Sequence, residues 1–269
     1  MKIIEFRGAS MGTIEGLLNA KKIIESQTEQ TIIVVSALGG VTSQLIEIFR
    51  LAENHDRKYE KLIQQLRQRH LDVIDSVVLD QNKDQCRQII TKFIDLNITP
   101  YCAMLMVNKE LDISIRAKLR EVVLAHGEIM ASAIVSSMVE DSSPHFAPNF
   151  IKTRDSGYER IIDWESTEEL VRKEFENNPE QRIIVQGYIA GDITTGHKTT
   201  LGRCGDDYTA AILATVLKIN SFDIWTNAER MAQGVNYVHP AALQLADNFK
   251  LKITLRDTYD PQGKVVVIR

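Results

Sequence analysis

A continuous run of β-branched residues, TIIVV at positions 31–35, most constrains what this chain can fold into. The run lacks the polar–apolar alternation of a strand with one solvated face, so both of its faces are expected to be buried. Strands of this kind belong to parallel sheets that helices cover on both sides. A second strand pattern, KIIEF, precedes it at residues 2–6, and an amphipathic helical pattern separates the two. This order predicts the start of an α/β fold.

The alternation of strand and helix patterns resumes after about residue 150 and continues to the end of the chain. The stretch between is helical in pattern, and no glycine occurs between Gly40 and Gly127. Further on, Ser166 and Glu169 have capping-box spacing and predict where one helix begins. With no internal repeat or linker, the sequence predicts a single α/β domain over residues 1–269. We expect an α/β/α sandwich with a largely parallel central sheet and a helix-rich excursion over about 45–138.

Composition argues against several classes of function. The chain has 32 Lys and Arg against 36 Asp and Glu, a net charge of −4, which is unlike the basic face of a nucleic-acid binder. No run of 18 apolar residues predicts a membrane span, and the opening MKIIEF lacks the apolar segment of a secretory signal. The three cysteines lack the spacing of a zinc site or a redox pair. We therefore expect a cytoplasmic protein without a resident metal, bound to neither nucleic acid nor membrane.

Glycine-bearing loops follow several of the predicted strands: RGASMG at 7–12, ALGGVT at 37–42 and TTLGRCGDDYTAA at 199–211. Backbone N–H groups in glycine turns that lead into helices bind anions, because unpaired donors and the helix dipole point the same way. None of the loops matches the P-loop or the dinucleotide-binding fingerprint. Because α/β sheets bind ligands at the carboxyl ends of their strands, these loops are the expected site.

In their order along the chain and in their amino-acid sequence, these loops resemble those of the aspartokinases of the amino-acid kinase superfamily. That family has a KFGGTSVG loop, then VVSA..GVT, a GE.LS segment on a helix, and TTLGRGGSDYTAA. The chain has EFRGASMG at 5–12, SALGGVT at 36–42, Gly127-Glu128, and TTLGRCGDDYTAA at 199–211. IWT at 224–226 and VHP at 238–240 match two later family segments. The resemblance extends from Met1 to Arg269.

The resemblance implies an amino-acid-kinase fold and transfer of the ATP γ-phosphoryl group to the β-carboxylate of L-aspartate. This is the first step of lysine, threonine and methionine biosynthesis, and it implies ATP and Mg²⁺. Family members often form homodimers, and many carry C-terminal ACT regulatory domains. The chain ends after the kinase-like portion, so no ACT domain is expected within it.

The resemblance also assigns roles to residues of this chain. Asp207 matches the aspartate implicated in catalysis, Arg203 is implied to make a bidentate contact with a carboxylate, and Glu128 to meet the α-ammonium group. The residues implied to hold the amino acid are Ser36, Thr42, Glu128 and Arg203. The glycines whose backbone is implied to line the phosphate path are Gly8, Gly39, Gly40 and Gly205.

Each of these residues also has a purely structural interpretation. Asp207 can be the N-cap of a helix, Glu128 a surface charge on an exposed turn, and Arg203 an ordinary loop cation. Ser36 and Thr42 can be turn formers. The adjacent acids at 206 and 207 can chelate magnesium or begin a solvated helix.

The departures from the family pattern gather on the nucleotide side. The first-loop lysine is Glu5 here, the next glycine is Arg7, and the serine of GGSD is Asp206. The lysine before the VLHP segment is Asn236, and the aspartate after IWT is Asn227. Gly234 follows Asn227 by 234 − 227 = 7 positions, too few for the family's nucleotide-gripping segment.

Electrostatics indicates what these departures cost. A cation about 4 Å from a phosphate charge gains roughly 4 kcal/mol at an effective dielectric near 20, and a carboxylate there reverses the sign. We therefore predict a pseudokinase-like domain that has lost its ATP site and retains an amino-acid site. One alternative is an active aspartate kinase in which Arg7 supplies the missing cation. Another is a non-catalytic regulatory or partner subunit, and a kinase of a different acidic substrate is a further one.

Overall fold

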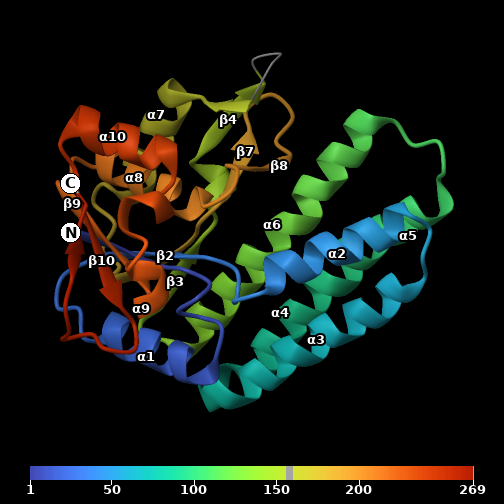
Figure 1. The fold of residues 1–269 in the computed structure, drawn as a ribbon, viewed down its shortest axis with the longest axis horizontal. Coiled ribbons are helices and arrows are strands. Elements are labelled where there is room, and N and C mark those ends of the chain that lie inside the picture. The colour runs from blue at the N-terminus through green and yellow to red at the C-terminus, as the bar shows by residue number, and fades with distance from the viewer. Residues whose placement is uncertain (156–159, 269) are drawn as a thin grey trace.

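The structure is a computed structural model that describes residues 1–155 and 160–268. Within these residues, the main sheet has seven strands, and only β10 and β11 run antiparallel to each other. β1 lies at the centre of the sheet between β9 and β2 (Figure 1). This largely parallel α/β sheet confirms the predicted fold class. In sheet order the strands are β11 (Val266–Val267), β10 (Lys252–Asp257), β9 (Ser221–Thr226), β1 (Lys2–Phe6), β2 (Thr31–Val35), β6 (Arg182–Gln186) and β3 (Ser142–His145).

β2 is buried along its whole length because helices cover both faces of the sheet. Ile33 and Val35 pack into the apolar cluster on the side of α1, whereas Ile32 and Val34 pack into the cluster that contains α8 and α10. Alternate side chains of residues 32–35 thus enter opposite apolar layers, which explains why this stretch of the strand is entirely apolar. The covering helices are α1 (Ile14–Glu25), α8 (Gly205–Val216) and α10 (Pro240–Phe249).

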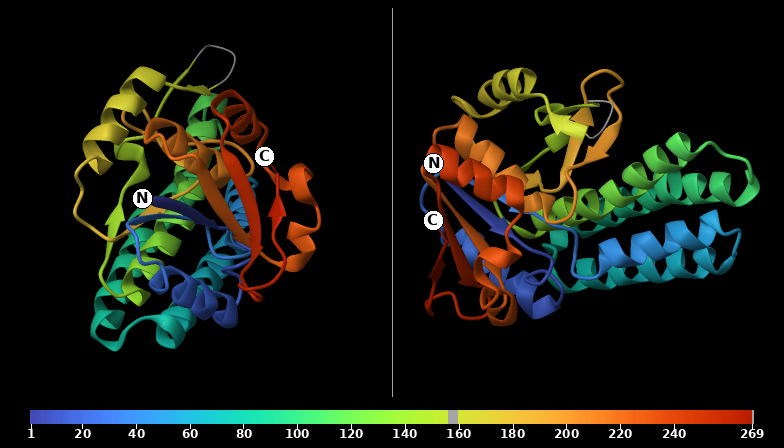
Figure 2. Two further views of the ribbon diagram at one scale, coloured as in Figure 1. Left: turned by 90° about the vertical axis from the view of Figure 1, so that its left-hand side faces the viewer. Right: turned by 45° about the horizontal axis from the view of Figure 1, so that its top comes forward.

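The segment between β2 and β3 is a helical bundle that extends away from the sheet (Figures 1 and 2). Its last helix, α6, returns to the sheet, and this helix contributes both to the bundle core and to the sheet layer. The bundle helices are α2 (Val41–Glu53), α3 (Lys58–Val77), α4 (Lys83–Phe93), α5 (Thr99–Val107) and α6 (Ile113–Met138), with a 3₁₀ turn η1 (Asp80–Asn82) and a π-helical turn η2 (Ile94–Ile98).

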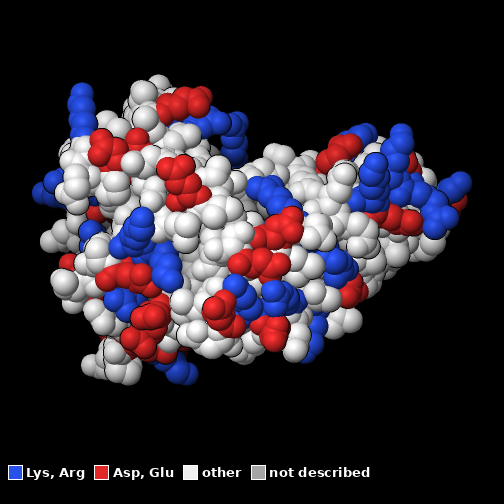
Figure 3. All heavy atoms as spheres, turned by 90° about the horizontal axis from the view of Figure 1, so that it is seen from below, with Lys and Arg blue, Asp and Glu red and all other residues white. Residues whose placement is uncertain are grey.

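Among the helices that the structure describes, only α6 is long and apolar enough, by length and composition, to cross a membrane. Of its most apolar window, 72% is buried inside the protein, as in the core helix of a soluble protein. On the face drawn in Figure 3, basic and acidic side chains are interspersed over the bundle. Ion pairs on the bundle helices include Arg50–Glu47 and Arg87–Asp84.

A smaller sheet lies beside the main one, with the strand order β5-β4-β7-β8 in the described part of the chain. The adjoining helix α7 begins at Trp164, and the Asp163 carboxylate accepts a hydrogen bond from the backbone N–H of Ser166. The predicted capping box at Ser166 and Glu169 is therefore wrong, because Asp163 caps the helix three residues earlier. The elements are η3 (Ala147–Asn149), β4 (Lys152–Asp155), β5 (Arg160–Ile162), α7 (Trp164–Phe175), β7 (Ile189–Asp192) and β8 (Lys198–Thr200).

Candidate active site

A cavity of about 690 Å³ opens at the carboxyl ends of β1 and β2. The loops after these strands form one wall, α6 forms another, and the loop between β8 and α8 closes the third. The strand order brings the loops together, because β1 and β2 are parallel neighbours and end at the same edge of the sheet. The residues predicted from sequence that line the cavity are Arg7, Gly8, Ser36, Gly39, Gly40, Thr42, Glu128, Arg203 and Asp206.

The two glycine loops touch each other through their backbones. A Cβ atom on Gly39 would lie 2.6 Å from the carbonyl oxygen of Gly8 and 2.7 Å from Cα of Gly12, which no side chain tolerates. Gly40 has a φ of 84°, in the left-handed region that glycine adopts without strain. Arg69 of α3 donates to the carbonyl oxygen of Gly39 and ties the bundle to this loop. Close approach therefore requires glycine at position 39, and the left-handed backbone favours it at position 40.

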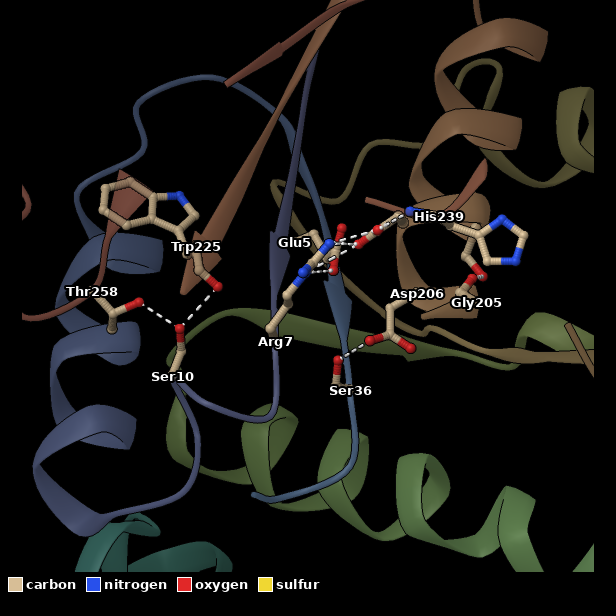
Figure 4. A network of polar contacts seen from close by, with 11 residues as sticks. Glu5, Arg7, Ser10, Ser36, Gly205, Asp206, Trp225, His239 and Thr258 are labelled. Carbon is tan, nitrogen blue, oxygen red and sulfur yellow. Dashed lines mark hydrogen bonds and ion pairs between the residues drawn. The ribbon is translucent and has the colours of Figure 1, made fainter. Parts of the chain in front are cut away.

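Arg7 is the centre of the charged network at the end of β1 (Figure 4). Its Nη2 atom lies 2.5 Å from both carboxylate oxygens of Asp207, and its Nε atom donates to Oδ1 over 3.1 Å. Asp207 also accepts a 2.7 Å hydrogen bond from the backbone N–H of His239. Arg7 is 4% exposed and lines the cavity, whereas Asp207 is 0% exposed and lies behind it. The carboxylate is thus fully engaged within the protein.

Glu5 belongs to the same network. It is completely buried, and its Oε1 atom lies 3.5 Å from Nε of Arg7, with no hydrogen bond to either carboxylate oxygen in the described residues. Burial raises the pKa of the Glu5 carboxyl well above its usual value, and the charge of Asp207 raises it further, while Arg7 acts in the opposite direction. One arginine therefore faces two acids, and burial beside Asp207 favours the protonated form of the Glu5 carboxyl.

A second acidic wall comes from α6 and α8. Asp206 accepts a short hydrogen bond from the Ser36 hydroxyl, and Glu128 is 3% exposed, with Oε1 accepting from the backbone N–H of Ala37 at 3.3 Å. The Oε2 atom of Glu128 is buried without a partner in the described residues. Burial raises the pKa of both carboxyls, and the Asp206 charge raises that of Glu128 further.

Arginines also line the cavity, and one of them, Arg120, lies on the same helix as Glu128. Arg203 is exposed on the loop before α8, and Arg120 and Arg230 line the cavity as well. The Tyr237 ring lies 4.0 Å from the guanidinium carbon of Arg7 and 5.3 Å from that of Arg230. Sequence reasoning missed Arg69, Arg120, Arg230 and Tyr237, because none of them belongs to a glycine loop or to a quoted motif.

The short segment after β9 supplies Arg230 and Tyr237. It consists of α9 (Ala228–Met231) and a 3₁₀ turn, η4 (Gly234–Tyr237). Asn227 caps α9 by accepting from the backbone N–H of Arg230 at 3.0 Å, and Asn236 is exposed outside the cavity. The compactness of this segment lets Tyr237 stack on Arg7.

Other predicted residues lie elsewhere. Gly205 packs against Leu201 and Tyr188, where a Cβ atom would lie 2.9 Å from Cβ of Leu201. Asp207 is not the N-cap of α8, because the helix begins at Gly205 after Cys204, which has a left-handed backbone. Glu128 is a buried helical residue and not part of an exposed turn.

The two adjacent aspartates engage separate partners, Asp206 with Ser36 and Asp207 with Arg7. Over residues 1–155 and 160–268, no group of three or more His, Cys, Asp or Glu side chains is placed to hold a metal ion. The cavity combines carboxyl groups with guanidinium groups, the complement of a zwitterion that carries an extra carboxylate.

Comparison with known proteins identifies the family. The sequence profile of the Amino acid kinase family matches residues 2–242. This chain belongs to the amino acid kinase family. The bifunctional aspartokinase/homoserine dehydrogenase from chloroplasts of Daucus carota is 24% identical over 295 residues, which cover 96% of this chain and 31% of that protein. Lysine-sensitive aspartokinase 3 of Escherichia coli is 23% identical over 292 residues, or 97% of this chain and 62% of its own length.

Solved structures of this family share the fold. E. coli aspartokinase III in complex with aspartate and ADP has a TM-score of 0.83 at 21% identity, over 100% of this chain and 65% of that one. The aspartate kinase of Clostridium acetobutylicum has a TM-score of 0.75 at 14% identity, over 99% of this chain and 62% of that one. The chain is thus an aspartokinase-like domain that spans from about a third to about two thirds of the length of these relatives, and the predicted resemblance is confirmed.

Proposed function

We propose that this aspartokinase-like domain binds L-aspartate, or a similar small acidic amino acid, and transfers phosphate poorly or not at all. The observation that carries the proposal is the buried pair between Arg7 and Asp207, with Glu5 beside it. E. coli aspartokinase III is known in a complex with aspartate and ADP, so an amino acid and a nucleotide are the ligands to test.

The amino-acid half of the proposal rests on charge complementarity. The unpaired Oε2 atom of Glu128 and the carboxyl of Asp206 suit an α-ammonium group, and Arg203 and Arg120 suit carboxylates. Because burial raises the pKa of Glu128, an arriving ammonium group favours its charged form and displaces its proton. Binding should therefore release protons.

The catalytic half rests on what Asp207 can reach. Phosphoryl transfer depends on positioning charged groups around the reacting phosphate, with little covalent work by the protein. Asp207 already satisfies Arg7 and the His239 N–H, and Arg7 stands between it and the cavity. Freeing it requires breaking a buried ion pair, which typically costs about 3–5 kcal/mol. At about 1.4 kcal/mol per tenfold, that cost corresponds to a slowing of roughly two to three and a half powers of ten.

The nucleotide side supports the same conclusion. The short segment after β9 places Tyr237 on Arg7 and leaves Asn236 outside the cavity. Glu5, at the position of the family lysine, adds an acid to a region that would have to meet a polyphosphate. We therefore expect weak ATP binding.

Calorimetry and phosphate trapping test the proposal. L-aspartate should bind with release of protons, seen as a dependence of the heat on the buffer's ionisation enthalpy. Glu128→Gln should weaken L-aspartate binding at least tenfold. Lys218→Met, far from the cavity, should leave this affinity unchanged. Mg-ATP should bind weakly or not at all, and hydroxylamine should trap no aspartyl phosphate. Turnover at the rate of an ordinary biosynthetic kinase contradicts the proposal.

An active kinase is the second candidate, and one observation favours it. The Nη1 atom of Arg7 has no hydrogen-bond partner in the described residues, although the side chain lines the cavity. The atom is itself buried, so a phosphate oxygen would have to displace the groups that cover it in order to supply the missing acceptor. If this candidate is right, trapped aspartyl phosphate should appear with the wild-type chain and vanish with Arg7→Met and with Asp207→Asn.

A further inference from the structure

A second cavity, of about 640 Å³, lies on the other side of α6 from the candidate active site. α4, the π-helical turn η2, α6, β3 and β8 contribute to its wall. We propose that this cavity is a separate ligand site for an organic carboxylate with an aromatic or other apolar body. The residues that carry the proposal are Lys198, His126, Phe93, Phe146 and Asn97.

Lys198 supplies the cation. It lies on β8 and lines the cavity, and its ammonium group has no hydrogen bond or ion pair to the described residues. Its nearest described aromatic partner is the Phe146 ring, 6.0 Å from Nζ to the centroid. No Asp or Glu of the described residues lines this cavity. Two histidines, His126 and His145, are the other basic side chains that the described residues contribute to this wall. His145 is already paired with Glu174 and Glu180. A single unneutralised positive charge therefore faces the space.

His126 supplies a neutral polar edge. It is 1% exposed, and its Nδ1 atom lies 2.7 Å from the carbonyl oxygen of Val122, so Nδ1 carries the ring proton. The Nε2 atom makes no hydrogen bond to the described residues. Burial lowers the pKa of His126 to about 4, and the charge of Lys198 lowers it further, so the ring is neutral at pH 7. His126 thus adds no second charge.

Aromatic and aliphatic side chains supply the apolar part of the wall. The rings of Phe93 and His126 have centroids 5.9 Å apart and are tilted by 60°. Phe146 lies at the Lys198 end, and Ile129 of α6 adds aliphatic surface. A flat apolar body fits between such side chains better than a chain of hydroxyl groups does.

Other polar side chains also line the wall, Gln186 and Asn97 among them. Gln186 is 4% exposed, donates to the Ser132 hydroxyl at 2.7 Å and accepts from the backbone N–H of Ala147 at 2.9 Å. Asn97 belongs to the π-helical turn that joins α4 to α5. Turns of this kind are rare and are frequent at functional sites. With one cation available, a monoanionic carboxylate matches the site better than a dianionic phosphate.

Both cavities share structural elements. α6 places Glu128 in the candidate active site and His126 in the second cavity, and β8 places Thr200 in the first and Lys198 in the second. We therefore expect that occupancy of one cavity changes affinity in the other, by the same factor in both directions. This coupling, unlike the second site itself, rests on the proposed function.

Naphthalene probes test the site. 1-Naphthoate should bind the wild-type chain, and Lys198→Met should weaken it at least tenfold, as measured by equilibrium dialysis. The affinity for the neutral 1-naphthalenemethanol should differ less than twofold between the wild-type chain and Lys198→Met. Lys218→Met, in the groove between α7, α8 and α10, is the matched control and should leave both unchanged. Ala133→Phe, which fills the cavity, should abolish binding of both probes while the far-UV spectrum stays native.

Each outcome decides a part of the proposal. Naphthoate binding that Lys198→Met leaves intact overturns the site, and so does equal binding of the neutral probe. Tighter binding of 1-naphthyl phosphate than of naphthoate overturns the carboxylate assignment. An unchanged naphthoate affinity in saturating L-aspartate overturns the coupling alone. Since these titrations need no turnover and no aspartate, failure of the proposed function leaves their result on the second site intact.

Discussion

At the scale of single residues, Arg7 determines how the end of β1 is charged. It neutralises Asp207 through a bidentate contact and lies near Glu5, and Tyr237 covers its other face. A buried arginine flanked by two acids has a raised pKa because both acids favour its charged form, although burial acts against that. Its removal affects all of these neighbours together.

Arg7→Met should destabilise the chain by about 3–5 kcal/mol, since it leaves the buried Asp207 carboxylate without its counter-charge. Urea unfolding at pH 7 measures the loss. Arg203→Met is the control: this arginine is exposed on the same rim, so its replacement should cost less than about 0.5 kcal/mol. A loss below about 1 kcal/mol for Arg7→Met contradicts the importance assigned to the pair.

Glu5→Gln should stabilise the chain increasingly as the pH rises. The pKa of Glu5 is raised in the folded state. Its contribution to stability is therefore fully present below the pKa of the unfolded state and is lost as the pH rises through the pKa of the folded state. The amide does not titrate, so the variant avoids that loss. The loss is about 1.4 kcal/mol for each unit by which the pKa is raised in the folded state. Unfolding at pH 5 and pH 8 measures the difference, and a variant whose pH dependence equals that of the wild type contradicts the raised pKa of Glu5.

At the scale of elements, the contact between the β1–α1 and β2–α2 loops shapes the candidate active site. Gly8 and Gly39 meet backbone to backbone, and Arg69 reaches the second loop from α3. The cavity therefore depends on how tightly these loops approach each other.

Gly39→Ala should cost about 1–3 kcal/mol, because the added methyl group overlaps backbone atoms that cannot rotate away. The loops must separate, so L-aspartate binding should weaken as well. Thermal unfolding and calorimetry check the two effects. Ser43→Ala, at an exposed position of α2 nearby, should change neither by a measurable amount. Unchanged stability in Gly39→Ala means that the loops are looser than the structure shows.

At the scale of the whole molecule, buried histidines limit stability in acid. His70 is 0% exposed and donates from Nδ1 to the carbonyl oxygen of Leu66 at 2.7 Å, and His126 is similarly placed. Burial lowers the pKa of each to about 4. Between about pH 6.5 and 4, the unfolded chain binds protons that the folded chain does not, so stability falls as the pH falls.

The loss between pH 7 and pH 5 should be about 2 kcal/mol for each buried histidine. His70→Gln should reduce this loss by about that amount relative to the wild type, when urea unfolding is compared at the two pH values. The exposed His197→Gln should leave the pH dependence unchanged. An equal loss in His70→Gln and wild type contradicts the neutral buried state of His70.

Local patterns of the sequence were sufficient for the fold class and the family. The apolar run of β2 dictates a sheet covered on both faces, and the glycine loops mark the end of the sheet at which the cavity opens. The start of α7 was mistaken, because several polar residues near Ser166 can cap a helix and only the backbone geometry selects Asp163. Patterns of this kind depend on neighbours in sequence.

The tertiary structure alone decided the state of the charges. Arg7 and Asp207 are 200 positions apart, and nothing in either loop indicates that the guanidinium turns toward that carboxylate and not toward Glu5 alone or the cavity. Likewise, no motif marks Lys198, Arg230 or Tyr237. Secondary structure follows from short-range periodicity, whereas pairing and burial of charges depend on distances that exist only after β1 and α8 have packed together.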